Sequence, residues 1–194
     1  GGEFTSVQSA DFSETVEAGY LARWDGTAWH AIPGGPDGPV HAIVKHGDEI
    51  CVGGGFSTPG SNVACLGADG WHALGDGLNS EVHVLYSEGT RLLAGGYFSF
   101  GDPSGPPTQF FVGLGSFTTG GNAWGPVAGG VIDGFITNVW EIAPTGDGGL
   151  WIGGNFSAVN AASPRPAENF ARLDGNNWTD VGGVRNELGV TLGS

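Results

Sequence analysis

The sequence predicts an all-β protein, and three observations support this fold class. Glycine accounts for 39 of the 194 residues and proline for another 11, which is too many turn-forming residues for long helices. No stretch shows a sustained 3.6-residue apolar periodicity, whereas short apolar runs bounded by turn residues are frequent. Hydrophobic residues still make up 39% of the chain, including 7 Trp and 11 Phe, so we expect a packed domain rather than a disordered segment.

The chain contains a fourfold repeat. The pattern Gly-Gly-x-Phe occurs four times, and each copy is followed by a tryptophan. The interval from tryptophan to the next glycine pair varies less than the interval from glycine pair to tryptophan, so the variable insertions lie between Phe and Trp. The repeat units are about 1–52, 53–94, 95–152 and 153–194. The repeated residues are Gly1, Gly2, Phe4, Trp29, Gly53, Gly54, Phe56, Trp71, Gly95, Gly96, Trp124, Gly153, Gly154 and Trp178.

Each unit is expected to hold four short strands. A first apolar run and a tight turn lead to a second strand that ends at the glycine pair. After the insertion come a third strand, an Asp-Gly turn typical of hairpins, and a fourth strand that carries the tryptophan. The expected strands include residues 40–44 and 82–86 (first), 49–52, 91–94 and 150–152 (second), 21–24 and 170–173 (third), and 29–32 and 71–74 (fourth).

Tandem four-stranded units of this length predict a β-propeller, a ring of radially arranged sheets called blades. Glycine at the end of the second strand would permit close backbone approach where blades crowd together. A tryptophan on the outer strand would cover the apolar gap between neighbouring blades. We therefore predict one propeller domain over residues 1–194, or an arc of a larger propeller.

A strand that ends in Gly-Gly, an insertion and a tryptophan strand together resemble the kelch-type repeat. The motif Ala-Arg-Trp-Asp-Gly-x-x-Trp at residues 22–29 is similar to kelch-like repeats of secreted bacterial proteins and of fungal cortical marker proteins. The resemblance covers essentially the whole chain. It implies a fold more than a function, because kelch-type propellers include binding modules, scaffolds and a copper oxidase.

One blade is expected to be divided between the two ends of the chain. Residues 1–4 read as the close of a second strand, and residues 190–192 as the start of a first strand. These segments either meet and close a four-bladed ring or belong to an arc that is completed elsewhere. An open arc would carry exposed sheet edges and favour self-association through the split blade.

Loops after the second and fourth strands are expected to share one face of the ring, here called the loop face. Acidic and aromatic residues gather there and form a candidate ligand surface. Its carboxylates can hold Ca²⁺ or simply solvate the loops, but no known calcium motif is present, so we expect no cofactor. The candidate ligand-binding residues are Asp11, Phe12, Tyr20, Asp37, Asp76, Phe100, Asp102, Asp133 and Phe135.

The histidines and cysteines are assigned to structure rather than to catalysis or metal binding. His41 and His83 share one repeat position with Trp140, which favours a packing role over metal ligation. His46 lies in a turn and is expected to be exposed. Cys51 and Cys65 either form one disulfide or remain two buried thiols.

The net charge of the chain limits the classes of partner that it can bind. Twenty acidic residues face six basic ones, a formal net charge of −14, which disfavours nucleic acid and anionic membrane surfaces. No apolar run is long enough to cross a membrane. We predict a non-enzymatic extracellular or cell-surface module that acts as a binding or assembly platform, with a protein or glycan at the loop face. The alternative is a lectin or a carbohydrate-active enzyme that uses the same face.

Overall fold

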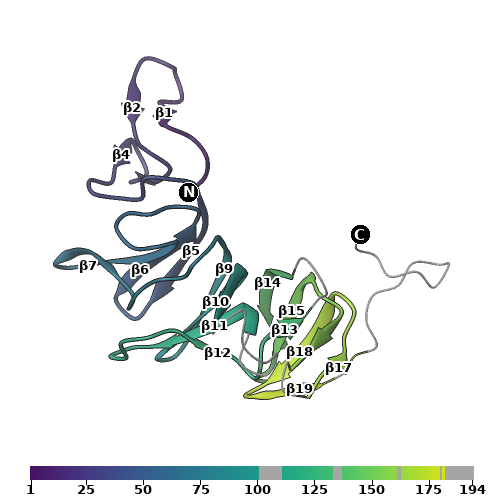
Figure 1. The fold of residues 1–194 in the computed structure, drawn as a ribbon. Coiled ribbons are helices and arrows are strands. Elements are labelled where there is room, and N and C mark those ends of the chain that lie inside the picture. The colour runs from purple at the N-terminus through teal and green to yellow at the C-terminus, as the bar shows by residue number, and fades with distance from the viewer. Residues whose placement is uncertain (101–110, 133–136, 161–162, 180, 182–194) are drawn as a thin grey trace.

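The protein consists of small antiparallel sheets that lie side by side in an open arc (Figure 1). The computed structural model describes residues 1–100, 111–132, 137–160, 163–179 and 181. Within these residues there are strands and turns but no helix, which confirms the predicted all-β class. Described residues likewise include no helix that could span a membrane.

Residues 40–73 form a sheet, here called the second sheet, whose four strands follow one another in sequence order. It combines the end of repeat unit 1–52 with the start of unit 53–94. Its first two strands meet at a turn containing Gly47, where a φ of 59° favours glycine. A disulfide joins Cys51 to the directly opposite Cys65, and both residues are fully buried. Of the two possibilities that the sequence left open, a disulfide or two buried thiols, the structure has the disulfide. The strands are β5 (Val40–His46), β6 (Glu49–Gly54), β7 (Val63–Gly67) and β8 (Gly70–Ala73).

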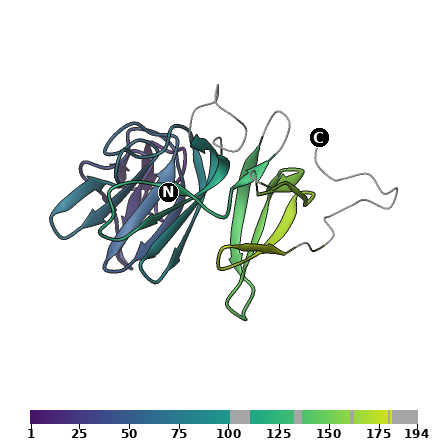
Figure 2. The same cartoon turned by 60° about the horizontal axis from the view of Figure 1, so that its bottom comes forward.

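Two further sheets, here called the third and fourth sheets, have the same strand order, and the turned view places them beside each other (Figure 2). First strands of successive sheets lie against one another, because β5 contacts β9 and β9 contacts β14. The third sheet contains β9 (Val82–Glu88), β10 (Arg91–Phe100), β11 (Phe111–Thr118) and β12 (Gly125–Pro126), and the fourth contains β14 (Asn138–Pro144), β15 (Leu150–Asn155), β18 (Phe170–Asp174) and β19 (Asn177–Thr179).

The N-terminal repeat is built from fewer strands. β3 (Ala22–Trp24) pairs with β4 (Trp29–Ala31). Residues 1–4 lie beside this pair, since the Gly2 amide donates to Tyr20 O (3.0 Å) and the Tyr20 amide to Phe4 O (2.8 Å). The predicted partner strand at residues 190–192 lies outside the described residues, and among the described residues no sheet closes on the first.

Several segments expected to be loops form strands instead. The insertion at residues 5–20 is a hairpin of β1 (Ser6–Gln8) and β2 (Thr15–Glu17). β13 (Val131–Ile132), β16 (Ala158–Val159) and β17 (Arg165–Pro166) add a ribbon to β11 and so link the third repeat to the insertion of the fourth. Short polar and proline-containing stretches of this kind have no clear apolar alternation, so tertiary pairing decides their conformation.

In three of the four repeated pairs, the second glycine lies opposite a β-bulge. In the first strands of three sheets, the register skips one residue: His41, His83 and Trp140. The bulge brings a carbonyl oxygen over the facing glycine. A Cβ at Gly96, for example, would lie 2.1 Å from the Glu81 carbonyl oxygen, a distance that no side chain tolerates. Gly54 and Gly154 have the same arrangement, at 1.9 and 2.1 Å from the carbonyl oxygens of residues 39 and 138.

In three of the four pairs, the first glycine receives a valine from the next sheet: Gly1, Gly53 and Gly95. A Cβ at Gly53 would lie 2.5 Å from Val82 Cγ1, and one at Gly95 would lie 2.6 Å from Val139 Cγ1. Both valines are fully buried. At the equivalent position in the fourth sheet, Gly153, the only atom of the described residues near such a Cβ is Glu141 Cβ, at 3.8 Å.

The repeated tryptophans join neighbouring sheets at their outer edge. Three of the four indole N–H groups donate to a carbonyl oxygen in the loop that ends the preceding sheet. The pairs are Trp71 to Pro33 O (3.1 Å), Trp124 to Leu74 O (3.0 Å) and Trp178 to Ala128 O (2.8 Å). The predicted role of these tryptophans between sheets is therefore seen at three successive junctions.

His46 corrects a sequence-based expectation. The residue ends β5, but its side chain is only 6% exposed. Nδ1 lies 2.8 Å from Ser87 Oγ and Nε2 lies 2.9 Å from Thr119 Oγ1. The ring therefore connects the second sheet to the third instead of facing solvent. The local sequence around His46 predicts a turn and does not indicate these distant partners.

Candidate functional site

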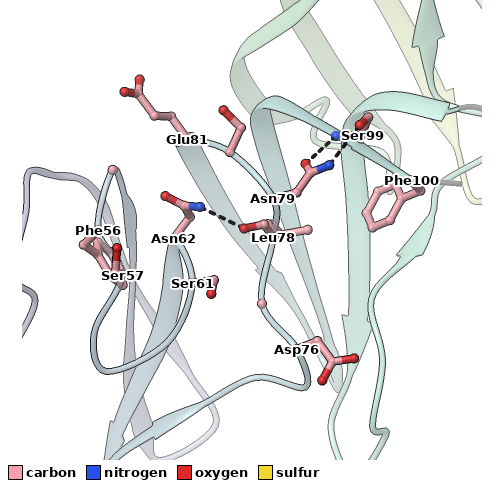
Figure 3. Close-up of a pocket in the computed structure, with 13 residues that line it drawn as sticks. Phe56, Ser57, Ser61, Asn62, Asp76, Leu78, Asn79, Glu81, Ser99 and Phe100 are labelled. Atoms are coloured by element: carbon pink, nitrogen blue, oxygen red, sulfur yellow. Dashed lines mark hydrogen bonds between the residues drawn. The ribbon is translucent and has the colours of Figure 1, made fainter. Parts of the chain in front are cut away.

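A groove of about 730 Å³ lies between the second and third sheets on the loop face (Figure 3). Three segments form it: the β6–β7 loop, the β8–β9 loop and the end of β10. Its volume falls in the range of small-ligand sites. The side chains that line it are mainly polar, and they are Phe56, Ser57, Ser61, Asn62, Asp76, Leu78, Asn79, Ser80, Glu81, Ser99 and Phe100.

Two loops are locked together at the floor of the groove. Asn62 has a φ of 63°, and its side-chain Nδ2 donates to Leu78 O at 2.8 Å. The Leu78 amide donates back to Ser61 O at 2.9 Å. Gly77, with a φ of 74°, passes so close to Ser61 that a Cβ would lie 2.5 Å from the Ser61 carbonyl oxygen. The floor therefore depends on a left-handed glycine at this crossing.

The opposite wall is held by a reciprocal pair of hydrogen bonds. Asn79 Nδ2 donates to Ser99 Oγ at 3.0 Å, and the Ser99 amide donates to Asn79 Oδ1 at 2.9 Å. The ring of Phe100 lies over Gly115, where a Cβ would come within 2.6 Å of Phe100 Cζ. A half-buried aromatic face is thus fixed beside the polar groups (Figure 3).

Asp76 and Glu81 give the groove a negative charge. They are the only ionisable residues that line it, with no lysine or arginine among the described lining residues. Both are exposed, and they lie at opposite ends of the groove (Figure 3). The charge adds to the strongly negative net charge of the chain and favours cationic or neutral hydrogen-bonding ligands over anionic ones.

The structure brings together only some of the residues assigned to the loop face. Asp76 and Phe100 line the groove. Asp37 supports it, because its Oδ1 accepts the amides of Thr58 (3.0 Å) and Ser57 (2.7 Å) in the β6–β7 loop. These hydrogen bonds lower the pKa of Asp37 below its ordinary value.

The remaining candidate residues lie away from the groove or outside the described residues. Asp11 and Phe12 occupy the tip of the β1–β2 hairpin, where Phe12 is 77% exposed. Hydrogen bonds from Ser13 and Ser9 lower the pKa of Asp11 to about 2. Tyr20 packs on the small core around Val40 and Val52. Asp102, Asp133 and Phe135 lie outside the described residues.

A second cluster of polar side chains lies on the first strands of the sheets, next to the groove. His41 of β5 and His83 of β9 have ring centroids 5.6 Å apart, and His83 stacks on Trp140 of β14 at 4.2 Å. Glu81, which also lines the groove, joins the two histidines. Burial and the neighbouring His41 lower the pKa of His83, while Glu81 acts in the opposite direction. The sequence placed these rings at one repeat position but gave no sign that they meet in space.

Two other histidines pair with carboxylates on the surface. His30 Nε2 lies 2.6 Å from Asp25 Oδ2, and His72 Nε2 lies 2.9 Å from Glu49 Oε1. Burial works against the charged form of His72, but the hydrogen bonds to Glu49 and to a backbone carbonyl raise its pKa. Glu49 also lies near the two cysteine sulfurs, but the disulfide removes both as metal ligands.

Comparison with protein-family models and with curated proteins finds no match for this chain. Function is therefore inferred from the geometry of the groove and of the sheet junctions.

Proposed function

We propose that this chain is a non-enzymatic binding module of the β-propeller type that acts outside the cell and captures its partner in the loop-face groove. The observation that carries the proposal is the groove itself. Loops of two successive repeats create a preformed, polar and negatively charged recess, with a fixed aromatic ring on one wall.

Support for a propeller comes from the junctions between sheets. Three tryptophan N–H groups bond the preceding repeat in the same way. Three glycines of the repeated pairs receive valines of the following sheet, and the first strands of three sheets lie against one another. A radial array of sheets joins neighbours through repeated contacts of this kind. The kelch-type resemblance stays a prediction.

An extracellular location agrees with two features. The disulfide between Cys51 and Cys65 is buried in the second sheet, and such bridges persist mainly in oxidising compartments. A net charge of −14 with few lysines suits a soluble surface that resists non-specific association.

The partner best suited to the groove is a protein segment that presents a lysine or arginine. Asp76 and Glu81 at the two ends would attract the cation, and the intervening serine and asparagine groups would bond its backbone. We expect peptides selected from a random display library to be enriched in basic residues and to bind more weakly as the salt concentration rises.

Charge-removing variants test this assignment. Asp76→Asn and Glu81→Gln should each weaken binding of a selected peptide about threefold to tenfold, the effect of a partly solvated charge pair. Asp48→Asn, the same change in the exposed β5–β6 turn, should leave affinity unchanged. Equal affinity in all three variants would show that the groove does not bind the peptide.

A glycan is the second candidate ligand, favoured by the side chain of Phe100 beside the amides of Asn62 and Asn79. Sugar sites commonly combine a ring face with hydrogen-bonding amides and carboxylates. A glycan array on the folded module separates the two candidates. A protein-binding platform should show no saturable sugar binding, whereas saturable binding that Asp76→Asn reduces would favour the lectin.

A further inference from the structure

The cluster on the first strands arises from the bulges. His41 and His83 are the two residues that the strand register skips in successive sheets. The residue skipped in the next sheet is Trp140, which stacks on His83. The repeat therefore places three ring-bearing side chains in a row across three sheets, and the two imidazoles are neighbours.

Glu81 completes a set of three potential metal ligands. His41, Glu81 and His83 each offer one ligand atom, and these three atoms all lie within 4.8 Å of one another. Glu81 stands two residues before His83, and its carbonyl oxygen accepts the Tyr97 amide at 2.9 Å, which fixes the backbone there. The side chain lies against Gly55, where a Cβ would come within 3.3 Å of Oε1. The absence of a side chain at residue 55 leaves room for this carboxylate.

Asn138 supplies an independent observation. It lies at the start of β14 in the fourth sheet, is only 7% exposed, and places Nδ2 3.3 Å from His83 Nε2. Its Oδ1 is buried and has no hydrogen-bond partner among the described residues. A buried oxygen without a donor is destabilising and calls for an explanation such as a bound water or ion. Here the amide lies directly against one of the two imidazoles.

We propose that His41, His83 and Glu81 bind one Zn²⁺ ion, with water as a further ligand. Two imidazoles and a carboxylate are a ligand set typical of zinc sites that keep an open position. A metal bound to His83 Nδ1 would leave Nε2 protonated, and with the Asn138 amide turned over this N–H would provide the donor that Oδ1 lacks. Calcium does not suit the site, because it takes six to eight oxygen ligands.

The site requires only small movements. Ligand atoms around tetrahedral zinc stand about 3.4 Å apart, given bonds of about 2.1 Å. His41 and Glu81 are exposed and can rotate, whereas His83 is held by Trp140 and Asn138. A metal here would join β5 to β9 and hold Glu81 at the edge of the groove. Zinc would neutralise Glu81, so basic peptides are expected to bind the chelator-treated protein more tightly than the zinc-bound protein.

Calorimetric titration with zinc chloride tests the proposal on chelator-treated protein, in buffer without reductant so that the disulfide stays closed. We expect saturable binding of one zinc ion per chain. His41→Gln and Glu81→Gln should each weaken it at least tenfold, because each removes one of three ligands at an exposed position. His72→Gln is the matched control, since His72 is also an exposed histidine beside a glutamate but has no third ligand in the described residues.

A second readout separates a metal site from general surface binding. Zinc should raise the melting temperature of the unmodified chain and of His72→Gln, but not that of His41→Gln. Lack of saturable zinc binding would overturn the proposal. Equal weakening in His41→Gln and His72→Gln would also overturn it, as would a preference for calcium over zinc.

Discussion

The glycine–valine contacts between sheets allow one substitution to be compared at equivalent positions. Gly95→Ala would place a methyl carbon 2.6 Å from Cγ1 of both Val139 and Val84. Ordinary carbon–carbon contacts are about 3.5–4.0 Å, so the buried Val139 and the partly buried Val84 must move by about 1 Å. Overpacking of this kind costs about 1–3 kcal/mol. Among the described residues, Gly153→Ala meets only Glu141 Cβ at 3.8 Å.

The expected difference in stability between the two variants follows from the different surroundings of Gly95 and Gly153. Neither glycine has a positive φ, so alanine at either place gains about 0.4–1 kcal/mol by restricting the unfolded chain. Gly95→Ala should therefore be destabilised by about 1–2 kcal/mol, and Gly153→Ala should be stabilised slightly. The two variants then differ by about 2 kcal/mol.

Urea unfolding followed by tryptophan fluorescence measures this difference. With a slope of about 2 kcal/mol per M, the midpoints of the two variants should lie about 1 M apart. Gly53→Ala, which faces Val82 at 2.5 Å, should behave like Gly95→Ala. If Gly153→Ala loses as much stability as Gly95→Ala, the contact with the next sheet is not the reason for glycine at these positions.

Three further outcomes are expected. Trp124→Phe keeps an aromatic ring but removes the N–H that bonds the preceding repeat, and should lower the free energy of unfolding by about 1–2 kcal/mol in the same urea assay. Reduction of the Cys51–Cys65 bridge, with a sequence separation of 14, should cost about 3 kcal/mol, whereas a variant with alanine at both positions should be unaffected by reductant. The pKa of His72 is higher in the folded protein than its ordinary value of 6.5. The ion pair with Glu49 therefore contributes its whole stabilising free energy below pH 6.5, and this contribution is lost as the pH rises through the pKa of the folded state. The loss should stay below about 1 kcal/mol, since both side chains are over a third exposed, and Glu49→Gln should abolish it in urea titrations at several pH values.

The strand pattern could be predicted from sequence because it depends on local features. Alternating apolar runs and glycine turns placed β5 and β9 correctly, and the spacing of Trp71 and Trp124 indicated a contact between repeats. Such features repeat, and repetition makes a weak local pattern recognisable. The glycine pairs were also assigned to close approach, which the structure traces to a bulge and to a neighbouring valine.

Features that depend on distant partners could not be predicted. His46 stands in a polar turn, and only the hydroxyls of Ser87 and Thr119 account for its burial. The groove brings Asp76 close to loops from two repeats, while Asp11, assigned to the same surface, lies in a separate hairpin. A bulge shifts side-chain direction without any sequence signal of its own, so the meeting of His41 and His83 was not visible from sequence.

Among the described residues, no side chain of a following sheet fills the space above Gly153. At the three earlier junctions, a valine of the next sheet fills the space above the first glycine of the pair. A strand that offers a valine above Gly153 can therefore dock without displacing any of the described side chains. Extension of the array in that direction therefore needs no remodelling of the sheet that would receive it.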